Sequence, residues 1–233
     1  MIEVFYPPQW FYKWEAIIDF ISVFVLSLIA IFSISYYAIN KKNRNYFYLG
    51  LSFLLIALSF IFKMLSNLII YSRVLKTGKV GFITISYEVI NSTNFHFAGL
   101  LVYRTLTVLG LYTLYLIHKR KQPRTNILIT LTLLLILVYF SQYNYHLFHI
   151  ISLIFLSCIT FEYYEIYGKN KSFLTKLVVC SYGLIAMSEF LFIFVRIDTL
   201  IYIIAELIQL IGYLILLFTF IKVRKNAKKK KQT

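Results

Sequence analysis

The residues of this sequence that could do chemistry are charged and polar side chains set inside long apolar segments. They are Asp19, Lys63, Arg104, Glu189, Glu206 and Gln209. A charged side chain at the centre of a bilayer costs about 2.5 to 3.5 kcal/mol, so such residues usually face the interior of a helix bundle and serve a function. We therefore expect these six residues to bind or gate a ligand or ion, with the two cations facing the three carboxylates.

Helical spacing gives several of these charges polar neighbours on the same helix face. The three groups are Tyr12, Glu15, Asp19 and Ser22; Ser52, Ser59, Lys63, Ser66 and Asn67; and Tyr202, Glu206, Gln209 and Tyr213. Arg104 and Glu206 fall at the same depth, each roughly 12 Å from the outer end of its segment at 1.5 Å per residue. The pattern predicts a polar pocket in the outer half of the bundle. The alternative is that the charges only pair with one another and hold the helices together.

The elements that must position these residues are transmembrane helices. The chain is 60% hydrophobic and 14% charged, whereas soluble domains carry about 25% charged residues. The fold class that we predict is an all-α integral membrane bundle of seven transmembrane helices. The expected spans are 17–38, 46–71, 96–117, 126–143, 146–167, 175–195 and 199–221, between an aromatic N-terminal segment, 1–16, and a basic tail, 222–233.

The distribution of basic residues predicts the orientation of the bundle. Lys and Arg gather in the connections near 41–44, 119–124 and 169–176 and in the tail. Basic connections stay on the cytoplasmic side, so we expect a cell-membrane protein with the N-terminus outside and the C-terminus in the cytoplasm. The tail residues expected to bind anionic lipid headgroups or an acidic protein partner are Lys222, Arg224, Lys225, Lys228, Lys229, Lys230 and Lys231.

The connection between the second and third spans, 72–95, contains a short alternation of apolar and polar residues. Over 83–89, Ile, Ile, Tyr and Val alternate with Thr, Ser and Glu. This period of two is typical of a half-buried strand. The sequence therefore predicts a short hairpin or strap at the membrane surface.

Three histidines are candidate metal ligands. His146 and His149 are three residues apart at the start of the fifth span, and His96 opens the third span on the same side. Three imidazoles could share one metal or hold a haem, and a membrane-embedded metal hydrolase would use them. No carboxylate lies at ligand spacing beside them, so we predict no resident metal or other cofactor.

The remaining motifs exclude several functions. The sequence contains no phosphate-binding Walker loop, no G-x-S-x-G and no H-E-x-x-H, so we expect no enzyme activity. Its basic residues lie in short runs between apolar segments, and no soluble module is present that could bind in a groove of a nucleic acid. We therefore expect no nucleic-acid partner. The function that we predict is a ligand-sensing or assembly module. The alternative is a small-molecule or proton-coupled transporter, although the spans contain no proline and no convincing repeat between the first and last three.

Overall fold

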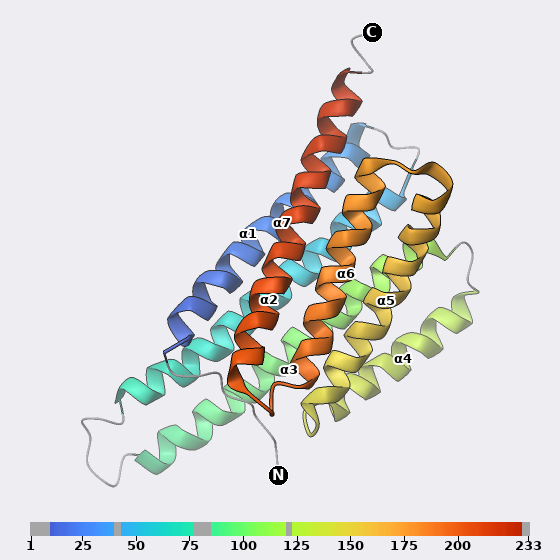
Figure 1. The fold of residues 1–233 in the computed structure, drawn as a ribbon. Coiled ribbons are helices and arrows are strands. Elements are labelled where there is room, and N and C mark those ends of the chain that lie inside the picture. The colour runs from blue at the N-terminus through green and yellow to red at the C-terminus, as the bar shows by residue number, and fades with distance from the viewer. Residues whose placement is uncertain (1–9, 40–42, 77–84, 120–122, 230–233) are drawn as a thin grey trace.

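The computed structural model describes residues 10–39, 43–76, 85–119 and 123–229 of the chain and consists of seven helices (Figure 1). They are α1 (Tyr12–Ile39), α2 (Asn45–Lys76), α3 (Ile85–His118), α4 (Arg124–Phe140), α5 (Tyr145–Asn170), α6 (Phe173–Ile193) and α7 (Thr199–Lys229). The described residues include no strand. The predicted all-α class is confirmed.

Six of these helices are long and apolar enough to cross a membrane. The outer surface of the bundle carries large apolar side chains, and Phe20 and Phe161 are 63% and 62% exposed. A bilayer is the solvent that suits such a surface, and the chain is therefore a multi-pass helical membrane protein. The exception is α4, whose 17 residues cover about 25 Å of a core about 30 Å thick. A membrane crossing by α4 stays a prediction.

Local sequence explains where several helices begin and end. Pro123 precedes α4 in an extended conformation, and the side chain of Asn144 caps α5 by accepting from the His146 N–H at 3.2 Å. Lys171, with φ 44°, ends α5 in the left-handed conformation, and Asp198 caps α7 through the Leu200 N–H at 2.9 Å. These are the usual devices for satisfying free backbone groups at helix ends.

The structure changes three of the predicted boundaries. α1 begins at Tyr12 instead of residue 17, so the helix includes Glu15. α2 continues to Lys76 and α3 begins at Ile85, which shortens the predicted connection 72–95. Residues 85–89 are helical, so the strand predicted for them is wrong, and residues 81–84 lie outside the described residues. A lone strand leaves its backbone groups unpaired at a membrane, whereas a helix pairs them internally.

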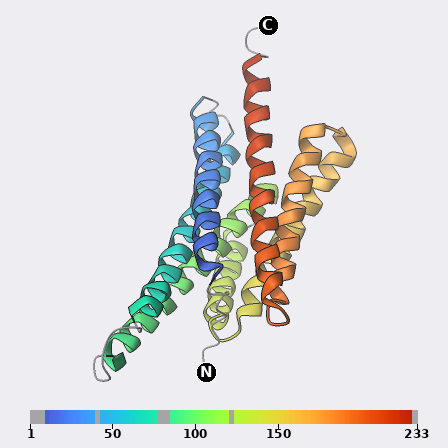
Figure 2. The same cartoon turned by 60° about the vertical axis from the view of Figure 1, so that its left-hand side comes forward.

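The helices form two groups of three. In the first group α2 packs against both α1 and α3, and in the second α6 packs against both α5 and α7. The groups meet where α1 lies against α7 and α3 against α5. Figure 2 shows the first half (α1–α3) and the second half (α5–α7) on opposite sides of the molecule. Among the described residues α4 packs only against α3 and α5. The bundle therefore has a central seam between two halves.

Long side chains bridge this seam between α2 and α7. No Cα atom of α2 lies within 8 Å of one in α7 among the described residues. The ring of Phe60 lies 5.8 Å from that of Tyr213, and the ring of Phe53 lies 6.0 Å from that of Phe220. All four side chains belong to the main apolar core or pack against it. The link between α2 and α7 thus depends on side chains instead of close backbone contact.

The two halves resemble each other at their second and third helices. Residues 52–59 of α2 read SFLLIALS and residues 181–188 of α6 read SYGLIAMS, identical at five of eight positions. A Cβ atom at Gly110 of α3 would lie 3.0 Å from the backbone carbonyl oxygen of Ser52 in α2. One at Gly212 of α7 would lie 3.1 Å from the backbone carbonyl oxygen of Ser181 in α6. A glycine of the third helix therefore packs against the equivalent serine of the second helix in both halves. The sequence thus contains a match between the halves that the expectation of no convincing repeat overlooked, and the structure adds a shared helix contact to it.

The bundle has two distinct ends. α1 begins and α7 ends at opposite ends (Figure 1), which we name the N-terminal end and the C-terminal end. α1, α3, α5 and α7 all end at the C-terminal end (Figure 1), and the sequence places basic residues in or directly after the last turn of each. This arrangement agrees with the charge pattern, and the orientation of the bundle in the membrane stays a prediction.

Candidate functional site

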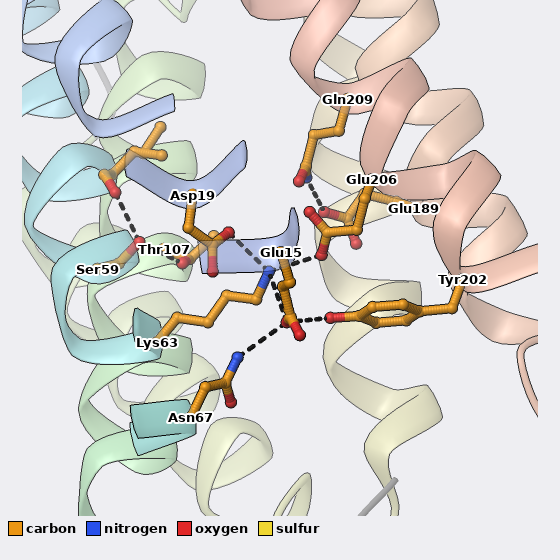
Figure 3. A network of polar contacts seen from close by, with 11 residues as sticks. Glu15, Asp19, Ser59, Lys63, Asn67, Thr107, Glu189, Tyr202, Glu206 and Gln209 are labelled. Carbon is orange, nitrogen blue, oxygen red and sulfur yellow. Dashed lines mark hydrogen bonds and ion pairs between the residues drawn. The ribbon is translucent and has the colours of Figure 1, made fainter. Parts of the chain in front are cut away.

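The ammonium group of Lys63 is the centre of a buried ionic cluster that joins α1, α2 and α7 (Figure 3). Its Nζ atom donates to Asp19 Oδ1 at 2.9 Å and to Glu206 Oε1 at 2.6 Å, and lies 3.6 Å from Glu15 Oε1. Lys63 is 8% exposed, and the three acids are at most 1% exposed. We name these four residues the Lys63 cluster.

Glu15 is the most heavily bonded acid of the Lys63 cluster. Its Oε1 atom accepts from Asn67 Nδ2 at 2.8 Å and from the hydroxyl group of Tyr202. Glu15 and Asp19 are four residues apart on α1, as are Lys63 and Asn67 on α2 and Tyr202 and Glu206 on α7. Residues at this spacing share one helix face, so each of three helices contributes two neighbouring groups.

The Lys63 cluster contains three carboxylates and one ammonium group. One oxygen of each carboxylate is buried and has no hydrogen-bond partner: Glu15 Oε2, Asp19 Oδ2 and Glu206 Oε2. A buried charge without a partner is costly, and buried polar atoms are nearly always satisfied. The site therefore has the capacity to take up protons or an organic cation.

A second polar group lies inside the second half. Glu189 Oε2 of α6 lies 2.8 Å from His149 Nδ1 of α5, and Glu189 Oε1 accepts from Gln209 Nε2 of α7 at 3.3 Å. The ring of Phe192 stacks on His149 with centroids 5.0 Å apart. The predicted site residues Glu189 and Gln209 are thus adjacent to each other, and they do not touch Lys63.

Arg104 does not join the Lys63 cluster, and its predicted position opposite the carboxylates is wrong. Its Nη1 atom donates to the Ser141 carbonyl oxygen at 2.5 Å, and its guanidinium lies 5.8 Å from the centroid of the Phe148 ring. Arg104 makes no ion pair within the described part of the chain. Equal depth did not bring Arg104 to Glu206 because α3 packs against α2, α4 and α5 instead of α7.

Glu15 was not among the predicted site residues. The signal was present, because Glu15 precedes Asp19 by one helical turn on the same face. Its place near the predicted membrane surface suggested a residue outside the span, whereas α1 begins at Tyr12. Asn67 and Tyr202 likewise lay on the predicted polar faces, and only the packing of α1 against α2 and α7 shows that they meet at Glu15.

The histidines do not assemble into a metal site. His149 pairs with Glu189, and His96 Nδ1 lies 3.1 Å from the Ser66 carbonyl oxygen. The third candidate, His146, packs against the ring of Tyr145. Among the side chains that the structure describes, no three of His, Cys, Asp or Glu are grouped so that they could hold a metal. The described residues therefore give no support to the metal-hydrolase alternative.

Part of the predicted lipid-binding tail belongs to α7. Lys222 Nζ lies 4.7 Å from the centroid of the Phe218 ring, and the Arg224 guanidinium lies 4.9 Å from that of Phe32. Lys225 is exposed. The side chains of Lys228 and Lys229 and the residues Lys230 and Lys231 lie outside the described part of the structure. Lys222 and Arg224 therefore rest on aromatic rings at the C-terminal end of the bundle.

Comparison with known proteins adds no relative. No protein-family model matches the sequence, and neither does any curated protein or solved structure. The functional argument therefore depends on the geometry of the Lys63 cluster and of the seam that it crosses.

Proposed function

We propose that this chain is a non-enzymatic membrane module that senses protons or an organic cation at the Lys63 cluster. The observation that carries the proposal is that three buried carboxylates share one ammonium group and keep three oxygens without a partner. An organic cation or protons would supply the missing partners and reduce the excess negative charge. The site has no nucleophile paired with a base, so binding fits it better than catalysis.

Binding at this cluster would act on the seam between the halves. Asp19 and Lys63 belong to the first half and Glu206 to the second, and Lys63 bonds to both acids. Because side chains alone link α2 to α7, a change in charge at Glu206 alters one of the few links between them. The cluster would thus convert occupancy into a change in the position of one half relative to the other.

The distance between the halves tests this proposal. One nitroxide label is attached to Cys158 on α5 and a second to a cysteine in place of Leu54 on α2, both of which are exposed, with Cys180 replaced by alanine. Pulsed electron resonance in nanodiscs then measures the distance distribution between about pH 8 and about pH 4. We expect longer or broader distances at low pH, because acids of the Lys63 cluster that take up protons hold Lys63 less strongly.

The matched variants are Glu206→Gln, which removes the charge that crosses the seam, and Glu189→Gln, which removes a buried charge within the second half. The pH response should disappear in the first variant and persist in the second. A wild-type distribution that is unchanged over the pH range would contradict the proposal.

Transport is a second candidate, favoured by the repeat. Gly110 and Gly212 occupy the same place against Ser52 and Ser181, and transporters are often built from two repeated units that rock about a central site. Substrate-dependent proton flux into proteoliposomes, abolished by Glu206→Gln, would support transport. Seam movement without flux would leave sensing as the function.

The setting that we propose is the cell membrane, with the N-terminal end of the bundle outside. The basic connections at the C-terminal end and the cations of α7 support this orientation through the positive-inside rule. Anionic headgroups and an acidic protein partner would then contact the cytoplasmic end, while the Lys63 cluster would receive its ligand from the outer side.

A further inference from the structure

A cavity of about 180 Å³ lies between α1 and α2 beside the Lys63 cluster. Its apolar wall comes from Tyr12, Ala16, Met64 and Leu68. Ala16 and Leu68 are exposed, so the cavity opens on the outer, membrane-facing surface of the bundle. Its size is close to that of an engineered cavity of about 150 Å³ that binds benzene. The space therefore suits one ring or a short alkyl chain.

The polar part of the same cavity leads to the Lys63 cluster. Asp19 and Asn67 belong to its lining, and Asp19 is fully buried with an Oδ2 atom that has no partner. Lys13 also lines the cavity but is exposed, and a lysine so placed can extend its ammonium group into the headgroup region. The deep end is thus acidic and short of hydrogen-bond donors.

We propose that this cavity binds a small organic primary amine in its ammonium form, with the ammonium group on Asp19 and an apolar body between α1 and α2. The ammonium group supplies both the N–H donors and the positive charge that the cluster lacks. The apolar wall accepts a body that the bilayer can deliver. This inference rests on the proposed function, because it names the class of cation that the cluster senses.

The geometry also indicates how such an amine would act. Asp19 Oδ1 already accepts from Lys63 at 2.9 Å, and Lys63 also donates to Glu206 at 2.6 Å. A ligand ammonium on Asp19 neutralises that carboxylate and weakens its hold on Lys63. Lys63 then associates more strongly with Glu206, which tightens the link across the seam.

Benzylamine and benzyl alcohol form a matched pair of probes, because they share the ring and differ in the charged donor. Binding is measured by calorimetry and by thermal unfolding in phosphatidylcholine nanodiscs, whose headgroups carry no primary amine. We expect benzylamine to bind and to raise the unfolding temperature. Equal effects of the two compounds would indicate partition into apolar space only and would overturn the inference.

Two substitutions on the exposed side of α1 locate the site without touching the Lys63 cluster. Ala16→Phe fills the cavity, whereas Ile17→Phe places the same aromatic side chain at an exposed position that does not line it. The dissociation constant of benzylamine should rise by roughly tenfold or more in the first variant and change less than about twofold in the second. Equal affinity in the wild type and in Ala16→Phe would overturn the inference. Loss of benzylamine binding when phosphatidylethanolamine is added would also overturn it, because the site would then belong to a lipid headgroup.

The pattern of results separates this inference from the proposed function. If benzylamine fails to bind while the distance between the halves still responds to pH, the amine site is wrong and proton sensing stands. If neither benzylamine nor pH changes the molecule, both are wrong. Benzylamine binding that survives in Asp19→Asn would also overturn the inference. If Asp19→Asn does not fold, the affinity of Ala16→Phe for benzylamine tests the site instead.

Discussion

At the scale of single residues, the molecule depends on one lysine that holds three acids from two helices. Lys63 donates to Asp19 and Glu206 and lies near Glu15, and no other cation reaches these acids in the described residues. Removing a partner from a buried ion pair is much more costly than exchanging the whole pair for apolar groups. The stability of the bundle should therefore be unusually sensitive to the charge at position 63.

The substitution Lys63→Met tests this dependence. It leaves three buried carboxylates without a cation, and we expect the free energy of unfolding to fall by about 3 to 5 kcal/mol. Unfolding by dodecyl sulfate in mixed micelles measures the change. The control Lys176→Met removes an exposed lysine and should have little effect. Adding Glu206→Gln to Lys63→Met should cost less than the sum of the two single changes, and strict additivity would mean that the two residues do not interact.

Arg104 should behave independently of the cluster. It donates to the Ser141 carbonyl oxygen and shares no partner with Glu206, so Arg104→Ala and Glu206→Gln should be additive within about 0.5 kcal/mol. The single change Arg104→Ala removes a charged hydrogen bond worth about 1.5 to 3 kcal/mol. A double-mutant cycle on unfolding free energies measures both quantities. A large coupling energy would mean that Arg104 and Glu206 interact, as their equal depth in the membrane had suggested.

At the scale of helices, two glycines set how closely the third helix of each half approaches the second. A Cβ atom at Gly110 or Gly212 would lie 3.0 or 3.1 Å from a carbonyl oxygen of the neighbouring helix, and 2.5 or 2.6 Å from an isoleucine side chain. Such distances are too short for ordinary packing. The close approach is possible because small residues bring transmembrane helices together.

Alanine at these positions tests the packing of the repeat. Gly110→Ala and Gly212→Ala should each destabilise the bundle by about 1 to 3 kcal/mol, because the added methyl group forces the helices apart. Gly168→Ala is the matched control: a Cβ atom there meets nothing within 4 Å, and alanine should be neutral or stabilising by up to about 1 kcal/mol. Thermal unfolding in one detergent compares the three. If the two halves are equivalent, the alanine substitutions at positions 110 and 212 should lower the unfolding temperature by similar amounts.

At the scale of the whole molecule, the membrane orientation and the crossing by α4 can be tested together. Single cysteines replace Tyr143 and Asp198 at the N-terminal end of the bundle and Ser172 at the other end, all exposed, with Cys158 and Cys180 changed to alanine. A membrane-impermeant maleimide should label positions 143 and 198 on intact cells and position 172 only after lysis. Labelling of position 172 on intact cells would reverse the orientation. Position 143 follows α4 and position 125 lies in its first turn. Cysteines at these two positions should differ in labelling in the same way if α4 crosses the membrane.

The sequence by itself determined the kind of protein and the residues worth examining. Apolar length specifies membrane helices because a bilayer leaves no other way to satisfy the backbone, and the buried charges stood out because each is costly there. The predicted places of Asp19, Lys63 and Glu206 on inward faces agree with the Lys63 cluster that forms. Their depth along each helix could be calculated from the residue spacing alone.

Only the tertiary structure decided which faces meet. Depth and helical face are properties of one helix, whereas partners depend on which helices are neighbours, and nothing in the periodicity of α3 shows that it packs away from α7. Arg104 therefore bonds to Ser141, Glu189 to His149, and Glu15 completes the cluster. The helix contact that the two halves share became visible for the same reason, because matching glycines against matching serines is a relation between helices.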